Sequence, residues 1–382
     1  MNNETRKETQ VLPKDVRYVG ADDLTLPLFE NQYPVQPMGV SYNSYLILDE
    51  KIAVMDSVDA RAADEWLAKL AHELDGRSPD YLVISHMEPD HSGSILRLAE
   101  KYQEMKLVGN TKTFTMLRQF FGAKAPTDDR LLEVGEGETL PLGAHTLHFM
   151  LAPMVHWPEV MVAYEETEKL LFSADAFGRF GALSRTAAAP WAPQARRYYY
   201  NIVGKYGAQV QALLKKASAL EIKTVCPLHG PVLTGEALGE ALRLYDLWSR
   251  WQSESPDDIL LAHASIHGNT ARAAELLKQK LEAKGARVTL CDLTTTEVSY
   301  AVANAFYCGK LVLACSTYDG GLFPPMEEFL SHLQAKGFRD RSVGLMENGS
   351  WAPAAARLMR AKLEEMKDLR VCGTVVSLRS AL

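Results

Sequence analysis

The sequence predicts an α/β protein with two hydrophobic cores, the second of which is built on a doubly wound parallel sheet. Its 382 residues exceed the size of one ordinary domain. A short polar joint, Ser253–Asp257, divides the chain into two stretches with different patterns. Beyond the joint, five apolar runs of strand length alternate with helical patterns, which is typical of a parallel sheet covered by helices. We therefore predict one domain over residues 1–252 and a second over residues 253–382.

Strands and helices of the second domain are expected in strict alternation. The strands are expected at Ile259–Ala264, Arg287–Leu293, Lys310–Ser316, Ser342–Glu347 and Val371–Leu378. The helices are expected at Thr270–Lys284, through the 300s, at Pro325–Gln334 and at Ala352–Met366. The first domain is mixed, with a hairpin predicted around Asp49–Lys51 and a helix predicted over Ala60–Leu74.

Composition and charge exclude several classes of protein. Hydrophobic residues make up 47% of the chain and charged residues 23%, which suits a soluble protein with buried cores. The sequence contains no run of about 18 apolar residues that would predict a transmembrane helix. Its polar start, residues 1–7, lacks the apolar core of a signal peptide. We expect a cytoplasmic protein without membrane attachment, and the net charge of −7 argues against nucleic acid as a partner.

The cysteines are few and scattered, and none forms a C-x-x-C pair. That pattern excludes a disulfide framework and a built-in rubredoxin-type iron centre, so the cysteines are expected to be small buried residues. They are Cys226, Cys291, Cys308, Cys315 and Cys372.

Four potential metal ligands stand within six residues directly after an apolar run, Tyr81–Ile84, that predicts a short buried strand. Pro89 and the following Ser92–Ser94 predict a loop at the carboxyl end of that strand. Imidazoles and carboxylates packed so tightly in a folded protein indicate a bound cation, and the alternative is a solvated acidic turn. The four residues are His86, Glu88, Asp90 and His91.

Three further candidates have the same placement, because each follows an apolar run and precedes a turn. They are His156, Asp175 and His229. Polar residues at the ends of several strands converge on one site, which a packing role does not require. Other histidines lack this setting and are expected to lie at the surface or in satisfied positions; these are His72, His145, His148 and His332.

A second site is expected in the C-terminal domain, where Ser265–Thr270 joins the first strand to its helix. Hydroxyl groups, a glycine and the free N–H groups of a helix N-terminus suit a phosphate, although the same residues also make a plain helix cap. The segment has no Walker lysine and no G-x-G-x-x-G, which favours a monophosphate over a triphosphate or dinucleotide.

Two further loops follow the third and fourth strands, and in open α/β sheets ligands bind outside these strand ends. Tyr318 and Trp351 are expected to flank a flat ring, so phosphate loop and aromatic residues together favour flavin mononucleotide (FMN). The predicted contacts are Ser265, Ile266, His267, Gly268, Asn269, Thr270, Ser316, Thr317, Tyr318, Asp319, Gly320, Gly321, Asn348, Gly349, Ser350 and Trp351.

With these motifs, the chain from Tyr18 onward resembles the flavodiiron proteins, or A-type flavoproteins. The motifs are HMEPDH, HWPEVM, SADAFG, PLHGP, ASIHGNT and YDGGLFPP. The resemblance implies a metallo-β-lactamase-like αββα sandwich over residues 1–252 and a flavodoxin-like domain over residues 253–382. The family normally adds a closing helix after the fifth flavodoxin strand, and this chain ends at Leu382 without one.

The resemblance also implies a ligand set for two irons per chain. His86, Glu88 and His156 are expected to hold one iron. Asp90, His91 and His229 are expected to hold the other, with Asp175 as the bridge. Zinc hydrolases of similar fold usually show H-x-H-x-D-H, whereas Glu88 here makes the set richer in oxygen and favours iron. Two ferrous ions, three carboxylates and one hydroxide also sum to zero charge, which limits the desolvation cost of a buried site.

The resemblance predicts an oxidoreductase that reduces O2 to water, NO to N2O, or both, with electrons passing through FMN to the diiron site. A redox donor such as rubredoxin or its reductase is expected, as is a head-to-tail homodimer or a dimer of dimers. Glu30 stands where many members place a histidine near the irons, and Tyr198 is expected either to line the pocket or to pack in a helix. The alternatives are a dinuclear zinc hydrolase with an appended flavodoxin module and an electron carrier with an inactive metal site.

Overall fold

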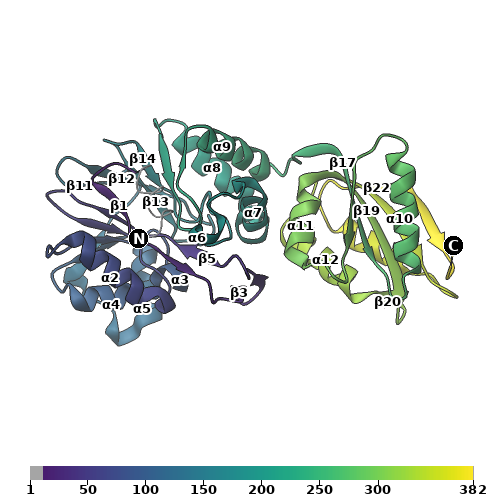
Figure 1. Ribbon diagram of the computed structural model, residues 1–382, viewed down its shortest axis with the longest axis horizontal. Coiled ribbons are helices and arrows are strands. Elements are labelled where there is room, and N and C mark those ends of the chain that lie inside the picture. Colours follow the sequence, from purple (N-terminus) through teal and green to yellow (C-terminus); the bar gives the residue numbers. More distant parts are fainter. Residues whose placement is uncertain (1–11, 382) are drawn as a thin grey trace. The chain divides into compact units, whose positions relative to one another are not determined.

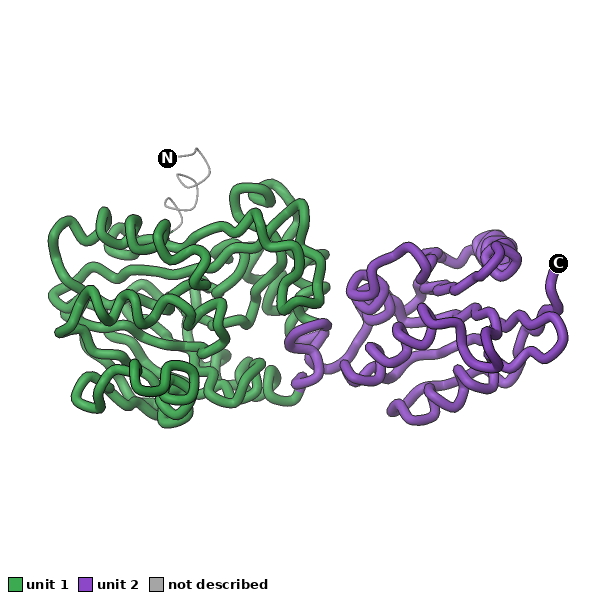
Figure 2. The backbone as a smooth tube through the Cα atoms, turned by 90° about the horizontal axis from the view of Figure 1, so that it is seen from below, with its two compact units in different colours: residues 1–199, 208–245 green, residues 200–207, 246–382 purple. Residues whose placement is uncertain are grey.

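The computed structural model describes residues 12–381, whose contacts form two compact units (Figure 2). Unit 1 consists of the described residues up to Tyr199 together with Ala208–Tyr245. Unit 2 consists of Tyr200–Gly207 and the described residues from Asp246 onward. The predicted domain boundary between residues 252 and 253 stays a prediction.

Unit 1 contains two six-stranded sheets, with the strand orders β1-β6-β7-β8-β9-β10 and β11-β12-β13-β14-β15-β16. The first sheet consists of β1 (Val16–Tyr18), β6 (Tyr45–Ile47), β7 (Ala53–Met55), β8 (Tyr81–Val83), β9 (Lys106–Gly109) and β10 (Leu131–Glu133). The second consists of β11 (Thr139–Pro141), β12 (Thr146–Leu151), β13 (Met161–Glu165), β14 (Leu170–Phe172), β15 (Thr224–Cys226) and β16 (Leu233–Thr234). Two small ribbons pair β2 (Ala21–Asp23) with β5 (Val40–Tyr42) and β3 (Leu28–Phe29) with β4 (Tyr33–Pro34).

The two sheets pack face to face around a shared core. Tyr45 and Met55 of the first sheet belong to one buried cluster with Phe149, Met161 and Phe172 of the second. Burying such side chains is worth roughly 2–3 kcal/mol each, so this cluster is a major source of stability.

Helices cover the outer faces of the sandwich, with α2, α4 and α5 over the first sheet and α8 and α9 over the second (Figure 1). In α2, Trp66, Leu70 and Leu74 repeat every four residues and are buried, as a helix with one core-facing side requires. The arrangement confirms the predicted αββα sandwich. The helices are α2 (Ala63–Leu74), α3 (Pro89–Ser92), α4 (Ile95–Lys101), α5 (Thr111–Phe121), α6 (Leu183–Thr186), α7 (Trp191–Tyr198), α8 (Gly207–Ala217) and α9 (Gly235–Ser249).

The loop predicted at Pro89 is wrong, because Pro89–Ser92 forms the short helix α3. Pro89 is its first residue, where proline costs no hydrogen bond since the N–H of that position has no partner within a helix. Glu88 precedes the helix as its N-cap residue. Helix α3 therefore directs the side chains of Asp90 and His91 toward His86, which follows β8.

Unit 2 has the predicted parallel sheet, with strand order β18-β17-β19-β21-β22. Helix α10 packs on one face, and on the other face α12 contacts both α11 and α13. This is the 2-1-3-4-5 order of flavodoxin-like folds and confirms the doubly wound prediction. The strands are β17 (Ser255–Ala264), β18 (Val288–Asp292), β19 (Cys308–Tyr318), β20 (Gly321–Leu322), β21 (Ser342–Asn348) and β22 (Arg370–Leu378). The helices are α10 (Asn269–Glu282), α11 (Val298–Tyr307), α12 (Pro324–Ala335) and α13 (Ala355–Glu364).

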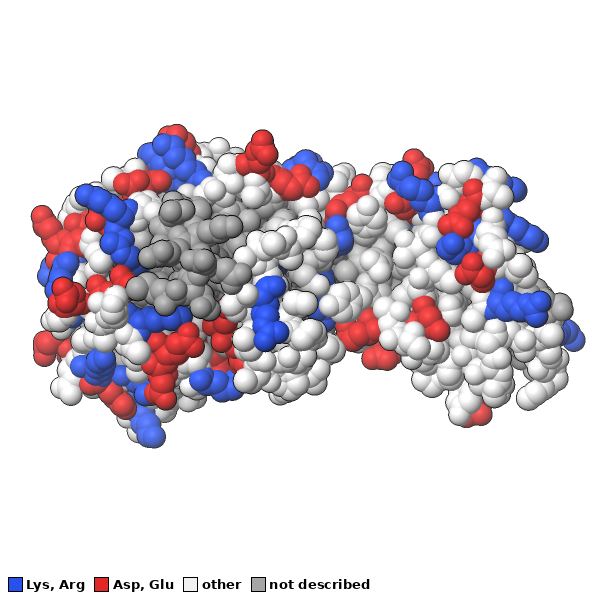
Figure 3. Space-filling model, in the orientation of Figure 1, with Lys and Arg blue, Asp and Glu red and all other residues white. Residues whose placement is uncertain are grey.

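Surface and cysteine expectations can also be compared with the described residues. Lys and Arg side chains alternate with Asp and Glu across the face shown in Figure 3.

Among residues 12–381, every helix is too short or too polar to cross a bilayer. Four cysteines are buried as expected, whereas Cys372 is exposed on β22. Cytoplasmic location stays a prediction.

Candidate functional site

Seven side chains from distant parts of unit 1 converge at one end of the sandwich. Their ligand atoms form two groups, and within each group all atoms lie within 4.8 Å of one another. The first group is His86, Glu88, His156 and Asp175, and the second is Asp90, His91 and His229. The seven are the residues that the sequence analysis singled out as metal ligands.

Short strands place these residues. His86 follows β8, His156 follows β12, Asp175 follows β14 and His229 follows β15. Strands β14 and β15 are parallel neighbours, so their carboxyl ends lie at the same edge of the sheet. Because polar side chains at such ends point away from the packed core, they are free to meet.

Asp175 offers one carboxylate oxygen to each group. Its Oδ2 lies 3.0 Å from His156 Nε2 and 3.5 Å from His86 Nε2. Its Oδ1 lies 3.3 Å from His91 Nε2 and 3.7 Å from His229 Nε2. This is the arrangement that a carboxylate shared by two cations requires.

Several buried oxygens at this site accept no hydrogen bond from the described residues. They include both carboxylate oxygens of Asp90 and Oδ1 of Asp175. Leaving ionised oxygens buried without partners costs several kcal/mol unless positive charge compensates them. The donor set therefore fits metal cations: histidine nitrogens and three carboxylates, with the oxygen-rich character that favours iron or manganese over zinc.

The electrostatics of the cluster point the same way. Burial alone would lower the pKa of His156, but hydrogen bonds with Asp175 and Glu88 raise that pKa to about 9. Burial also lowers the pKa of His86, but hydrogen bonds with Glu159 and Glu88 outweigh this effect and raise that pKa well above its usual range. The pKa of Asp175 is held well below its usual range by His156 and His91, against the effect of burial. The cluster thus keeps its carboxylates ionised and attracts positive charge.

Glu159 is a site residue that the sequence analysis missed. It is buried, and its Oε1 lies 2.7 Å from His86 Nδ1 and accepts a hydrogen bond from the Met87 N–H at 2.9 Å. A carboxylate only accepts hydrogen bonds, so Nδ1 carries the proton and Nε2 faces the cluster. Burial raises the pKa of Glu159, but the hydrogen bond and charge of His86 outweigh this and lower it. Its signal was its place in the HWPEVM motif, three residues after His156.

His229 is oriented in the same manner from its other side. Its Nδ1 lies 2.6 Å from the backbone oxygen of Ser41, which can only accept, so this nitrogen is the donor and Nε2 points to Asp90 at 3.2 Å. Asn43 donates to the carbonyls of Pro227 and Gly230 and thereby fixes the loop that carries His229. The Ser41 carbonyl is a backbone group that every residue has, so its contact with His229 could not be predicted from the sequence.

A cavity of about 630 Å³ opens beside the cluster in unit 1. Glu30 lines it, together with the predicted ligands Glu88 and Asp90. Arg61 is also part of its lining; it pairs with Asp59 at 2.9 Å and donates to the Tyr42 hydroxyl at 3.1 Å. The structure therefore brings Glu30 to the mouth of the site.

Tyr198 is fully buried beside His229, with ring centroids 5.5 Å apart. Its ring also contacts Phe29 and Phe180. The hydroxyl has no hydrogen-bond partner among the described residues. Burial raises the pKa of Tyr198 well above its usual value, and the charge of Asp175 adds to this, so the phenol keeps its proton. Tyr198 is the last residue of α7 and does not belong to the lining of the 630 Å³ cavity, so its role stays a prediction.

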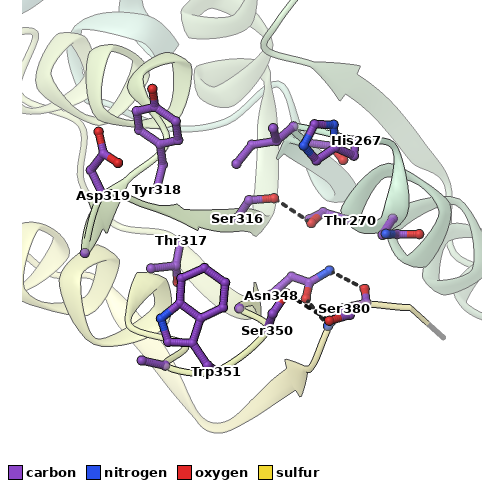
Figure 4. Close-up of a pocket in the computed structure, with 16 residues that line it drawn as sticks. His267, Thr270, Ser316, Thr317, Tyr318, Asp319, Asn348, Ser350, Trp351 and Ser380 are labelled. Atoms are coloured by element: carbon purple, nitrogen blue, oxygen red, sulfur yellow. Dashed lines mark hydrogen bonds between the residues drawn. The ribbon is translucent and has the colours of Figure 1, made fainter.

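Unit 2 has its own cavity of about 480 Å³ at the carboxyl ends of β17, β19 and β21 (Figure 4). All three predicted loops line it. Of the sixteen predicted contacts, Gly268 and Gly321 do not line the cavity, whereas Ala352 and Ser380 line it without having been predicted. Tyr318 and Trp351 lie on opposite sides of its outer end, 44% and 88% exposed.

The inner end of this cavity is polar. Thr270 Oγ1 and Ser316 Oγ are 2.8 Å apart and connect the first loop to the second. Gly268 is the N-cap residue before α10 and has φ +84°, a conformation that favours glycine, and its N–H donates to Ser265 Oγ at 3.1 Å. The start of α10 thus presents N–H and hydroxyl donors, which suits a phosphate.

Comparison with known proteins now decides the family. A family model described as "ODP family beta lactamase" matches residues 40–230, which is half of the chain. The chain belongs to this family. The matched part contains all seven strand-end ligands and most of the αββα sandwich.

Relatives of this ODP-family protein extend the likeness over both units. It is 28% identical to rubredoxin-oxygen oxidoreductase of Megalodesulfovibrio gigas over 91% of this chain and 87% of that protein. It is 27% identical to nitric oxide reductase of Moorella thermoacetica over 92% of this chain and 88% of that protein. Among solved structures, the rubredoxin oxygen:oxidoreductase of Desulfovibrio gigas superposes with a TM-score of 0.88 at 26% identity, covering 97% of this chain and 93% of that one. The flavodiiron protein of Giardia intestinalis gives 0.86 at 26%, covering 95% and 91%.

These likenesses confirm the resemblance to flavodiiron proteins. For this ODP-family chain the likeness implies a flavin and iron as cofactors, in agreement with the metal-ligand groups of unit 1. The relatives do not favour the zinc hydrolase or the inactive electron carrier.

Proposed function

We propose that this ODP-family protein is a flavodiiron-type oxidoreductase that reduces O2 to water, NO to N2O, or both, with electrons supplied through FMN. The observation that carries the proposal is the convergence of seven ligand residues in two groups, with one oxygen of Asp175 facing each group. The relatives named for oxygen and nitric oxide reduction support the choice of reaction.

Two irons per chain are the proposed metals. His86, Glu88 and His156 would hold one, Asp90, His91 and His229 the other, and Asp175 would bridge them. Two ferrous ions, three carboxylates and one hydroxide balance to zero charge, which suits a buried cluster. When bound, the irons supply open coordination positions for a diatomic gas and electrons for its reduction.

FMN is the proposed flavin of unit 2. The N–H and hydroxyl donors at the start of α10 would bind one phosphate, and Tyr318 and Trp351 would flank the ring. The absence of a Walker lysine in Ser265–Thr270 favours this monophosphate over larger nucleotides. When bound, the flavin supplies two electrons that it can release singly.

The chain's own residues orient and shield the site. Glu159 holds the protonated Nδ1 of His86, which keeps Nε2 free for a metal. The rings of Phe29 and Tyr198 lie edge-on or tilted against His229 and exclude water from that side. The proposed role of the Tyr198 hydroxyl is to donate a hydrogen bond into the site, and the proposed role of Glu30 is to move protons at the cavity mouth.

Partners follow from the same proposal. The protein would receive electrons from a redox donor such as rubredoxin or its reductase. It would act as a head-to-tail homodimer, or a dimer of dimers, in which residues 1–252 of one copy work with residues 253–382 of the other. The proposed location is the cytoplasm.

The test is anaerobic purification from iron-replete cells, followed by metal and flavin analysis and stopped-flow mixing of the reduced protein with O2 or NO. We expect about two irons and one FMN per chain and rapid reoxidation by at least one gas. Two zincs per chain and no consumption of either gas would overturn the proposal. The ratio of the two gas rates measures the preferred substrate.

A further inference from the structure

Ser380 forms a fourth segment of the cavity in unit 2, beyond the three loops that follow β17, β19 and β21. It comes two residues after the end of β22, and its side chain lies in the cavity lining with Ser350 (Figure 4). Ser350 belongs to the loop after β21, so residues from two different strand ends meet here.

Three hydrogen bonds fix Ser380 in place. Asn348 Nδ2 donates to the Ser380 carbonyl at 2.9 Å, and the Ser380 N–H donates to Asn348 Oδ1 at 3.0 Å. The Ser380 hydroxyl donates to Ser350 Oγ at 2.8 Å. Ser380 has φ +72°, which is uncommon for a residue with a side chain, so these bonds hold it in a conformation it would rarely adopt alone.

The pair of hydroxyls lies between the two ends of the cavity. In Figure 4, Ser350 and Ser380 stand between the indole of Trp351 and the start of α10, where Thr270 lies. If a ligand binds with its phosphate at the start of α10 and its ring beside Trp351, the part of the ligand that joins phosphate to ring lies next to Ser350 and Ser380. In FMN that chain is a polyol with three hydroxyl groups.

We propose that Ser350 and Ser380 form a hydroxyl-binding subsite for the ribityl chain of FMN. The inference rests on the proposed function of unit 2 as a flavin domain. After their mutual bond, the two serines still offer the Ser350 O–H as a donor and lone pairs on both oxygens. Both side chains are exposed to the cavity, and the backbone of Ser380 is already held by Asn348. Because these hydroxyl groups are already positioned, binding of a polyol costs little entropy for ordering the protein.

Binding of three different flavins distinguishes this subsite from the phosphate and ring subsites of the same cavity. FMN has ring, polyol and phosphate, riboflavin lacks the phosphate, and lumiflavin has the ring alone. Each is titrated into the flavin-free full chain, with quenching of flavin fluorescence as the measure of Kd. The variants are Ser380→Ala and Ser350→Ala, which remove one hydroxyl each. We expect either variant to weaken FMN and riboflavin binding about threefold to tenfold and to leave lumiflavin binding unchanged.

Control variants mark the other parts of the cavity. Ser377→Ala removes a hydroxyl that donates to Glu347 Oε1 at 3.0 Å outside the cavity lining, and we expect no change with any flavin. Thr270→Ala should weaken FMN alone, because its neighbourhood is assigned to the phosphate. Trp351→Ala should weaken all three flavins, because the indole faces the ring. Ser380→Gly tests the backbone separately, since glycine adopts positive φ without strain and lacks the hydroxyl.

The outcomes distinguish this inference from the proposed function. If both alanine variants weaken lumiflavin as much as FMN, the serines only support the loop and the subsite is wrong. Unchanged binding of all three flavins in both variants overturns it as well. If the unaltered chain binds no flavin at all, the proposed function of unit 2 fails and this inference fails with it.

Discussion

Glu159 Oε1 and His86 Nδ1 lie 2.7 Å apart in a place where both side chains are buried. The contact fixes the tautomer of a proposed ligand from outside the metal cluster. Such outer partners commonly change metal affinity by about 10-fold to 100-fold when they are altered. They also keep the ligand ring from rotating when the metal is absent.

The first prediction concerns this pair. Glu159→Gln removes the negative charge but keeps the shape, so we expect iron affinity to fall about tenfold or more while flavin content stays unchanged. Competition with a chromophoric chelator measures the affinity. Glu166→Gln is the matched control, because it alters an exposed histidine pair, His148–Glu166 at 2.8 Å, that should have no effect on metal binding. Equal metal affinity in both variants would show that Glu159 only packs against His86.

The second prediction concerns Asp175. Since its two oxygens face different groups, Asp175→Ala should remove most of the bound metal and abolish gas reduction. FMN content should stay at one per chain, because the residues lining the flavin cavity all belong to unit 2. Elemental analysis and the flavin absorption spectrum of the same sample give both numbers. Loss of FMN in step with the metal would contradict the assignment of the two cofactors to separate units.

The third prediction concerns the unpartnered hydroxyl of Tyr198. Tyr198→Phe removes one oxygen atom from a buried position where no described residue bonds to it, so thermal stability and metal content should stay the same or rise slightly. Gas turnover should fall about tenfold or more if the hydroxyl donates into the site during reduction. Stopped-flow rates together with the melting temperature separate these effects. Unchanged rates would make Tyr198 a packing residue.

Much of this site was predictable because its residues follow a local rule. His86, His156, Asp175 and His229 each come after a short apolar run and before a turn, and both features are visible in the sequence. Glu159 does not follow this rule: it lies in the HWPEVM motif, but its partner His86 is 73 residues away, and the motif alone does not show that the two meet. Contacts of that kind depend on how the sheets pack.

The errors and omissions elsewhere have similar causes. Pro89 was read as a loop residue because proline usually breaks helices, but at the first helical position it is tolerated. The five strands and the flavin loops of unit 2 were visible from alternation and Gly-rich turns. Ser380 was missed because it follows the last strand, and its role appears only when Asn348 is seen to bind its backbone.

The fourth prediction concerns pH and the pair Asp49–His145, which links the β6–β7 turn to the β11–β12 turn. Burial alone would raise the pKa of Asp49, but hydrogen bonds from the N–H groups of His145 and Glu50 and from the His145 ring lower it to about 2. The folded-state pKa is thus below the usual 3.8. The stabilisation is fully present above pH 3.8 and is lost as the pH falls toward 2.

Asp49→Asn should therefore lower the free energy of unfolding by about 1–2 kcal/mol at neutral pH, and by progressively less below pH 4. Urea unfolding at a series of pH values measures the difference. The control is Asp64→Asn, since Asp64 pairs with Arg97 at 2.6 Å at the surface, where 89% of the Asp64 side chain is exposed. Such exposed pairs contribute roughly 0–1 kcal/mol. A constant difference between Asp49→Asn and the unaltered protein from pH 7 to pH 2 would contradict the role of this carboxylate.

The fifth prediction is that electrons pass between two copies of the chain. Helix α9 ends at Ser249 and β17 begins at Ser255, so the polar joint predicted at Ser253–Asp257 is short. Within unit 2, Arg341 donates to the Trp251 carbonyl at 2.8 Å, and Arg339 stacks over the Trp251 ring at 3.9 Å. A joint of about five residues spans at most roughly 17 Å, and this short reach is why we expect the flavin of one chain to serve the metal site of another. A head-to-tail dimer removes that requirement.

Mixing two inactive variants tests this idea. One carries Asp175→Ala and keeps FMN, and the other carries Thr270→Ala with Trp351→Ala and keeps the metals. After subunit exchange in mild denaturant, a heterodimer contains one intact flavin and one intact metal site on different chains. Transfer between chains predicts that the mixture regains part of the gas-reducing activity, because each heterodimer holds one complete path and should reach about half of the activity of an unaltered dimer. Transfer within a chain leaves every heterodimer without a complete path, because the intact flavin and the intact metal site never share a chain. Activity that stays at the level of the separate variants, despite exchange shown by mass spectrometry of differently tagged copies, would therefore place both cofactors of one electron path in the same chain.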